Sequence, residues 1–240
     1  MTRIETAMVL AAGLGTRMRP LTDTRPKCLV TVGGRTLMDH MLDRLVAAGV
    51  SRVVVNVHAH ADLLEAHLRG RRDVEILISD ERARLMDTGG GVRQALPLIG
   101  PAPYIHCNTD SLWEEPQGSA IARLVAGFDP ETMDARLLLA GMDNCLGFDG
   151  AGDFTMGADA RITLRGAAPS APFAWTGVQV VNPAIVAGEP LEPFSFKRLW
   201  VRAQAQGRLF GAPLGGFWMH VGDPRARDEA EARLAASRAP

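Results

Sequence analysis

The chain has 240 residues and a mass of 25.8 kDa, which is room for one domain. Hydrophobic residues make up 47% and charged residues 22%, so a packed core is expected and disorder of the bulk is excluded. The net charge of −1 gives no basic excess for nucleic acid or an anionic membrane surface. No apolar run approaches the roughly 18 residues of a membrane span, and residues 1–5 lack a signal-peptide pattern. We therefore expect a cytoplasmic protein without a nucleic-acid or membrane partner.

Short apolar runs alternate with helical patterns through the first 141 residues. The runs that predict strands cover 7–11, 52–57, 74–79, 104–108 and 136–141. The patterns that predict helices cover 36–48, 62–68, a segment opening at Thr88, and 118–128. This alternation predicts an α/β fold, Rossmann-like, with a mainly parallel sheet and helices on both faces. In such sheets ligands bind outside the carboxyl ends of the strands.

The pattern is less regular after residue 142. Strands are expected at 161–165 and 173–181, and helices at 197–206 and from Pro224 onward. There is no internal repeat and no linker. We predict one domain over 1–240, whose parts 1–142 and 143–240 do not fold independently.

The loop after the first strand carries the most information. It begins at Gly13 and contains Arg17, and Lys27 follows ten residues later. The dinucleotide fingerprint fails because Met18 stands where a third glycine is needed, and the Gly-Lys-Ser/Thr of the P-loop is missing. What remains is a loop of small residues whose amides suit phosphate oxygens, bracketed by two cations that suit a pyrophosphate.

The run from Gly13 to Lys27 reads G-x-G-T-R-M-x-P-L-T-x-x-x-P-K. This run resembles the signature of the sugar-1-phosphate nucleotidyltransferases, and the similarity continues through three further motifs: Asp87-Thr88-Gly89-Gly90-Gly91, Asn108-Thr109-Asp110 and Gly152-Asp153-Phe154. The resemblance implies a nucleotidyltransferase fold of the GT-A-like kind. Together with the length, it looks most like the short uridylyltransferases that act on N-acetylmuramate 1-phosphate in peptidoglycan recycling. Enzymes that join GTP to mannose 1-phosphate, or dTTP to glucose 1-phosphate, share the signature. A nucleotide-sugar binder without catalysis is the third alternative.

The resemblance implies roles for individual residues in the first half, which would bind the nucleoside triphosphate. Arg17 and Lys27 would be catalytic, because Arg17 would hold the triphosphate and Lys27 would neutralise the α-phosphate during attack. No protein nucleophile is expected, since the sugar phosphate attacks directly. The residues expected to bind the nucleotide are Leu10, Ala11, Ala12, Gly13, Gly15, Thr16, Arg17, Lys27, Ala83, Asp87, Gly89 and Gly90. Among them, the 83–87 loop and the Gly89 and Gly90 amides would read the base.

A metal site is expected where Asp110 follows the strand 104–108, because its carboxylate suits Mg²⁺. The family places a second carboxylate in a Trp-x-Asp-x-Gly motif near the C-terminus. This chain reads Trp218-Met219-His220-Val221-Gly222, so His220 stands in that position. Imidazole is a poor Mg²⁺ ligand and suits Mn²⁺ better. Asp223 is expected to cap the helix that starts at Pro224 rather than to replace the missing aspartate.

The second half, 143–240, would bind the sugar 1-phosphate. By analogy with the family, Asn108 and Asp153 would bind sugar hydroxyls. Asn144, the backbone at Gly177 and Lys197 are further candidates, with Lys197 placed at a helix start where it could meet the sugar phosphate. The expected partners are thus a nucleoside triphosphate and a sugar 1-phosphate. The sequence leaves monomer and dimer both open.

Overall fold

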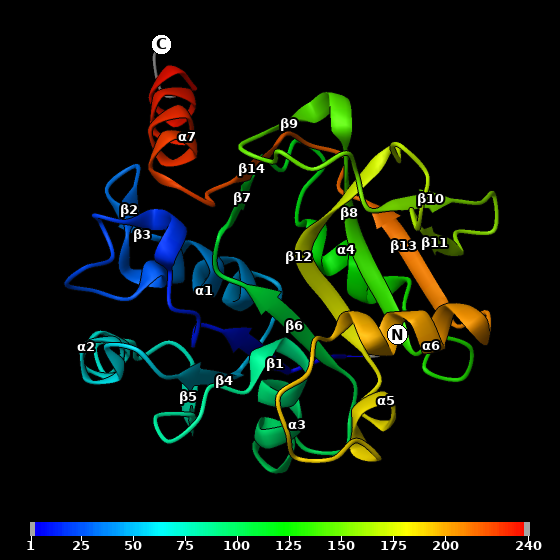
Figure 1. Ribbon diagram of the computed structural model, residues 1–240, viewed down its shortest axis with the longest axis horizontal. Coiled ribbons are helices and arrows are strands. Elements are labelled where there is room, and N and C mark those ends of the chain that lie inside the picture. Colours follow the sequence, from blue (N-terminus) through cyan, green and yellow to red (C-terminus); the bar gives the residue numbers. More distant parts are fainter. Residues whose placement is uncertain (1–2, 238–240) are drawn as a thin grey trace.

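A nine-stranded sheet runs through the computed structural model, which describes residues 3–237 (Figure 1). Seven strands follow the order β11-β10-β12-β6-β1-β4-β5, and β8 pairs with both β12 and β13. The bounds of these strands are β1 Thr6–Leu10, β4 Arg52–Val57, β5 Glu75–Asp80, β6 Tyr104–Asn108, β8 Ala135–Gly141, β10 Phe154–Met156, β11 Ile162–Leu164, β12 Phe173–Val181 and β13 Leu209–Pro213.

The part of the sheet built by the first half of the chain is parallel. Strands β6, β1, β4 and β5 pair in parallel, as their helical crossovers require. Strand β12 then pairs antiparallel with both β6 and β8, so a strand of the second half lies between two strands of the first. The prediction of an α/β fold with a mainly parallel sheet is confirmed, and the antiparallel pairing is concentrated in the second half.

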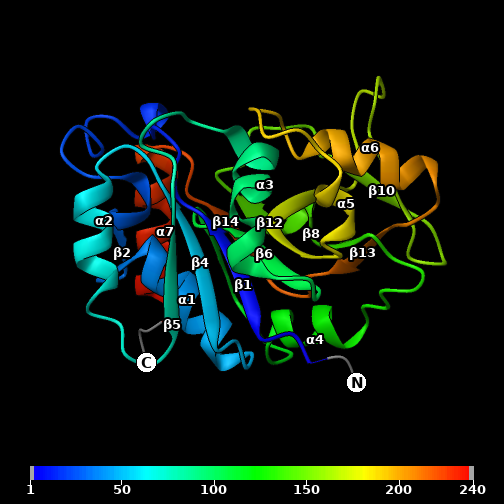
Figure 2. The same cartoon turned by 90° about the horizontal axis from the view of Figure 1, so that it is seen from below.

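Helices cover both faces of this sheet, and Figure 2 shows α1 and α2 on one side of β1, β4 and β5 with α3 on the other. One hydrophobic cluster joins the sheet to α1, α2 and α4, and a second joins its other face to α3, α5 and α6. The bounds are α1 Leu37–Ala47, α2 Ala61–Leu68, α3 Asp87–Ile99, α4 Ala120–Ala126, α5 Ala184–Ala187 and α6 Lys197–Ala205. Within residues 3–237 no helix is long and apolar enough to cross a membrane.

The C-terminal segment returns to the first half of the chain. Strand β14 (Trp218–His220) lies between β7 (Ser111–Trp113) and β9 (Cys145–Leu146) in a small second sheet. Helix α7 (Pro224–Ala236) follows and packs near the hairpin of β2 (Thr31–Val32) and β3 (Arg35–Thr36), as Figure 1 shows. A third hydrophobic cluster, which includes Met18, Met219 and Ala230, fills the space between them. His220 is thereby brought beside the end of β6.

Two of the predicted helices, those that begin near Thr36 and at Pro224, have a side chain that caps the N-terminus. The Thr36 hydroxyl accepts from the Asp39 amide at 3.0 Å, and the Asp223 carboxylate accepts from the Ala226 amide at 2.8 Å with Pro224 in the first helical position. Asp223 therefore caps α7, as expected. Strand β13 was not predicted, because its short run ends in Gly-Ala-Pro and lacks any period.

Candidate active site

A cavity of about 560 Å³ opens at the carboxyl ends of β1 and β6. The signature loop provides one wall, and Lys27, Asp87, Asn108 and Asp110 complete it. The loop residues that line this cavity are Leu10, Ala11, Ala12, Gly13, Gly15, Thr16 and Arg17. The structure thus brings together most of the residues expected to bind the nucleotide. We call this space the nucleotide cavity.

Two short 3-10 turns, η1 (Thr16–Met18) and η2 (Lys27–Leu29), give the loop its shape. Gly15 enters η1 with a φ of 63°, and its carbonyl accepts from the Thr22 hydroxyl at 2.8 Å. A Cβ at this position would lie 3.1 Å from the Cβ of Lys27, so the close approach also requires glycine. Gly15 therefore lets the loop pack directly against Lys27.

Lys27 and Asp110 form an ion pair at the floor of the cavity. The Lys27 Nζ donates to Asp110 Oδ2 at 2.7 Å, and the two side chains are only 16% and 20% exposed. Burial opposes ionisation of this carboxyl, yet Lys27 and His220 hold the pKa of Asp110 well below its usual range. The carboxylate is therefore charged at neutral pH and oriented toward the loop. Sequence reasoning found both residues but not their direct contact.

His220 reaches the same carboxylate from β14. Its Nδ1 lies 3.0 Å from the Gly147 carbonyl and its Nε2 lies 3.5 Å from Asp110 Oδ2. Because a carbonyl only accepts, Nδ1 carries a proton, and Nε2 faces the Asp110 carboxylate. An imidazole nitrogen beside a carboxylate oxygen fits a shared divalent cation, and a carbonyl on the far nitrogen is the usual support of a metal-binding histidine.

This donor set fits a divalent metal that is shared with a bound triphosphate. It offers one carboxylate and one imidazole, and the described residues 3–237 contain no cluster of three His, Cys, Asp or Glu side chains that could hold a metal alone. The remaining ligands would have to come from phosphate and water, as is common for Mg²⁺. His220 stands where the resemblance implies an aspartate, so the site has one carboxylate fewer than that pattern.

Asn56 and Glu81 form a buried network behind the loop that sequence reasoning missed. The Asn56 carbonyl oxygen accepts from the Ala11 and Ala12 amides at 2.7 and 3.3 Å, and its Nδ2 donates to Glu81 Oε1 at 2.7 Å. Glu81 Oε2 accepts from the Met86 amide at 3.0 Å. Burial raises the pKa of the Glu81 carboxyl. The network fixes the signature loop relative to the start of α3.

Gly89 and Gly90, whose amides are expected to read the base, have other contacts in the structure and do not line the nucleotide cavity. Both amides donate to the Phe194 carbonyl, at 2.8 and 3.2 Å, and are therefore not free for a ligand. A Cβ on Gly89 would run into the Phe194 ring, and a Cβ on Gly90 into the Glu192 carbonyl. These glycines thus serve close packing between α3 and the segment before α6. Ala83 is exposed and lines no part of the cavity, whereas Leu85 and Thr88 do.

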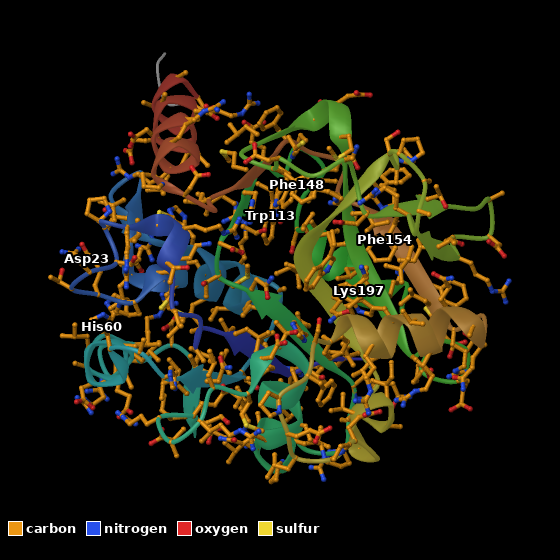
Figure 3. All side chains as sticks on the ribbon, viewed as in Figure 1. Asp23, His60, Trp113, Phe148, Phe154 and Lys197 are labelled. Carbon is orange, nitrogen blue, oxygen red and sulfur yellow. The ribbon has the colours of Figure 1, made fainter. Side chains whose placement is uncertain are left out.

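A second cavity of about 290 Å³ adjoins the first, since Thr88 lines both. We call it the sugar cavity. Asp153, Arg165, Trp175, Phe196 and Lys197 are among its lining residues. Asp153 Oδ2 accepts from the Trp175 amide at 2.9 Å, which fixes the carboxylate. Figure 3 shows Lys197 at the start of α6 and Phe154 on β10, on the same half of the molecule.

The remaining sugar candidates have different positions. Asn108 lines the nucleotide cavity at the end of β6, and a Cβ on Gly177 would lie 3.0 Å from the Cβ of Asn108. Gly177 has a φ of 85° and supports Asn108 by close packing. Asn144 ends the 3-10 turn η3 (Met142–Asn144), is exposed, and lines neither cavity.

Comparison with known proteins agrees with this geometry. The family model described as nucleotidyl transferase matches residues 6–131, more than half of the chain. The chain is 52% identical to the N-acetylmuramate alpha-1-phosphate uridylyltransferase of Caulobacter vibrioides over 95% of this chain and 96% of that protein. It is 34% identical to the protein of the same name from Neisseria meningitidis serogroup B, over 94% and 96%.

The fold is also that of solved nucleotidyltransferases. The structure of UDP-glucose pyrophosphorylase from Acinetobacter baumanii superposes with a TM-score of 0.81 at 17% identity, covering 98% of this chain and 95% of that one.

The sheet, with the signature loop at the carboxyl end of β1, thus defines an α/β protein of the nucleotidyltransferase fold. The chain belongs to the nucleotidyl transferase family. The expectation of an enzyme that transfers nucleotidyl groups to sugar 1-phosphates is confirmed.

Proposed function

We propose that this enzyme transfers the uridylyl group of UTP to N-acetylmuramate 1-phosphate, giving the UDP sugar and pyrophosphate in peptidoglycan recycling. The observation that carries the proposal is the near full-length similarity, at 52% identity, to a protein named for this reaction. Both cavities are compatible with it, since one has a phosphate-binding loop and the adjoining one has aromatic walls suited to a sugar ring.

In the proposed reaction a phosphate oxygen of the sugar attacks the α-phosphorus of UTP. The bond from that phosphorus to the bridging oxygen breaks, and pyrophosphate leaves. No proton transfer is needed, so the protein contributes alignment and charge. Arg17 and the amides of the signature loop bind the triphosphate, while Lys27 neutralises the charge that develops on the α-phosphate. Because Lys27 is already held at 2.7 Å by Asp110, the charge is preorganised.

Asp110 and His220 are the residues proposed to hold the divalent metal, Mg²⁺ with Mn²⁺ as the alternative. When bound, the metal supplies positive charge to the triphosphate. Lys27 contacts the Asp110 oxygen that His220 also faces, so a bound metal would meet a carboxylate that already has a cationic partner. Family membership supports a metal requirement, and the donor set described above is compatible with it.

The two parts of the chain are proposed to divide the substrates. Residues 1–142 bind the nucleotide, and residues 143–240 bind the sugar with Asp153 on its hydroxyls and Lys197 at the cavity rim. Asn108, at the end of β6, would reach a sugar hydroxyl from the nucleotide cavity. They remain halves of one domain, because strands of both contribute to one sheet. A cytoplasmic location and a monomeric or dimeric state stay predictions.

Release of pyrophosphate from a matrix of substrates tests the proposal. UTP, GTP and dTTP would each be combined with N-acetylmuramate, mannose and glucose 1-phosphates, with Mg²⁺ or Mn²⁺. We expect the highest kcat/KM for UTP with N-acetylmuramate 1-phosphate. A preference for GTP with mannose 1-phosphate, or dTTP with glucose 1-phosphate, would move the enzyme to one of those activities. Nucleotide binding without turnover on any pair would make it a binding protein.

A further inference from the structure

Arg165 carries a positive charge that the protein itself does not neutralise. The residue follows β11, and its Nε donates to the Gly152 carbonyl at 2.8 Å while Nη1 donates to the Ala168 carbonyl at 2.8 Å. Carbonyls orient the guanidinium but cancel none of its charge. No ion pair to Arg165 occurs within the described residues 3–237. Arg161, at the other end of the same strand, pairs with Asp159 at 2.6 Å.

The guanidinium borders the sugar cavity, where cations outnumber carboxylates. The charged lining residues are Arg165, Lys197 and Asp153. Asp153 is occupied by the Trp175 amide, and Lys197 is exposed and forms no ion pair in the part of the chain that the structure describes. Arg165 is half-buried and anchored twice, so it is the fixed cation of this cavity. A fixed guanidinium with spare donors is suited to bind a carboxylate.

The phosphate of the acceptor does not account for this charge. Its oxygen must reach the α-phosphate beside Lys27 and Asp110, which lie in the nucleotide cavity. Arg165 lines only the sugar cavity. An anionic group of the acceptor that lies beside Arg165 must therefore be a substituent of the sugar ring other than the 1-phosphate.

We propose that Arg165 is a specificity residue that selects sugar 1-phosphates with an acidic substituent by binding its carboxylate. This inference rests on the proposed function, because N-acetylmuramate differs from N-acetylglucosamine by a lactyl ether that ends in a carboxylate. Lys197 adds a second, mobile charge at the rim. The aromatic rings of Trp175 and Phe196 contact the sugar and exclude water around the pair, which strengthens it.

The test compares the two sugars, N-acetylmuramate 1-phosphate and N-acetylglucosamine 1-phosphate, with UTP. The wild type should favour the acidic sugar in kcat/KM. In Arg165→Gln the ratio of the two kcat/KM values should fall about tenfold or more, the effect of losing a hydrogen bond between charged groups. Most of the loss should appear in KM for the acidic sugar, and Arg165→Lys should restore part of it.

Arg161→Gln is the matched control, because it removes an exposed arginine that flanks the same strand and already has a partner. A purely structural Arg165, holding only the loop around Ala168, would weaken both sugars equally in Arg165→Gln and Arg165→Lys, and that result would overturn the inference. Failure of the wild type to use N-acetylmuramate 1-phosphate at all would instead overturn the proposed function. The two failures are therefore separable.

Discussion

Acid should destabilise this protein through His106, a fully buried histidine on β6. Both ring nitrogens lack a hydrogen-bond partner among the described residues, and the ring makes edge contacts to Phe196 and Trp175 at centroid distances of 4.9 and 6.0 Å. Burial lowers the pKa of His106 from 6.5 to about 3. The native protein therefore keeps this ring neutral over a pH range in which the unfolded chain protonates it.

The size of the effect follows from linkage. Below an unfolded pKa of about 6.5 the unfolded state binds one proton more than the native state, so stability falls by about 1.4 kcal/mol per pH unit. At about pH 5 this group alone removes about 2 kcal/mol of the free energy of unfolding, and the loss continues until the pH approaches the native pKa. Above about pH 7 the contribution vanishes.

Urea unfolding at about pH 7.5 and about pH 5 measures this loss in the wild type, His106→Leu and His106→Gln. Leu matches the volume and leaves no polar atom unpaired, so its stability at the higher pH should stay within about 1.5 kcal/mol of the wild type. The pH-dependent loss should shrink by about 2 kcal/mol in both variants. His60→Asn, at an exposed helix start with a φ of 52°, is the control that keeps the full loss. An unchanged pH dependence in both His106 variants would refute the reasoning.

Three further results are expected at the site. Arg17→Ala and Lys27→Met should each lower kcat at least about a hundredfold, which is the expected effect of removing one preorganised charge. Thermal stability should be unchanged in Arg17→Ala but reduced in Lys27→Met, because that variant leaves the Asp110 carboxylate without its ion-pair partner. Near-normal turnover in both folded variants would contradict the phosphate assignment. Asn108→Ala and Asp153→Ala should weaken sugar-phosphate binding but not UTP binding in calorimetry, whereas equal weakening of both would mean that they only shape the cavities. His220→Ala should raise the metal concentration for half-maximal rate, and His220→Asp should shift preference from Mn²⁺ toward Mg²⁺. Unaltered dependence on both metals in His220→Ala would leave this histidine as a support beneath the site.

Local patterns were sufficient to predict the parallel half of the fold. The apolar runs at 52–57 and 104–108 coincide with β4 and β6, because buried parallel strands are apolar on both faces. The helix starts at Thr36 and Pro224 were also predictable, since capping is decided by neighbours in sequence. The pairing of strands that are distant in sequence was not predictable, because it depends on which strand edges meet in space. The insertion of β12 between β6 and β8 is such a case.

The candidate site also divides into features with a local sequence pattern and contacts between distant residues. Residues in the signature loop were found because their spacing is a local property. The Lys27–Asp110 contact spans 83 residues and has no sequence signal. Asn56 does have a signal in the sequence, because this polar residue follows the apolar run Val53-Val54-Val55 near the carboxyl end of β4, where ligand sites form. For the glycines at 89 and 90 the sequence does not distinguish close packing from ligand approach, because both require glycine, and the structure shows the packing contacts.

The bonds from Gly89 and Gly90 to the Phe194 carbonyl have a consequence for how each substrate affects the affinity for the other. Thr88 borders both cavities, and its hydroxyl accepts from the Phe196 amide at 2.9 Å, so one short stretch of α3 is tied to the wall of the sugar cavity. A nucleotide that orders this stretch also orders the wall of the sugar cavity. The loss of conformational entropy then accompanies binding of the first ligand and is not repeated for the second. UTP should then raise the affinity for the sugar phosphate, and by linkage the sugar phosphate should raise the affinity for UTP by the same factor. Titration of the sugar phosphate with and without a non-hydrolysable UTP analogue measures that factor, and a value of one would mean that the two cavities fill independently.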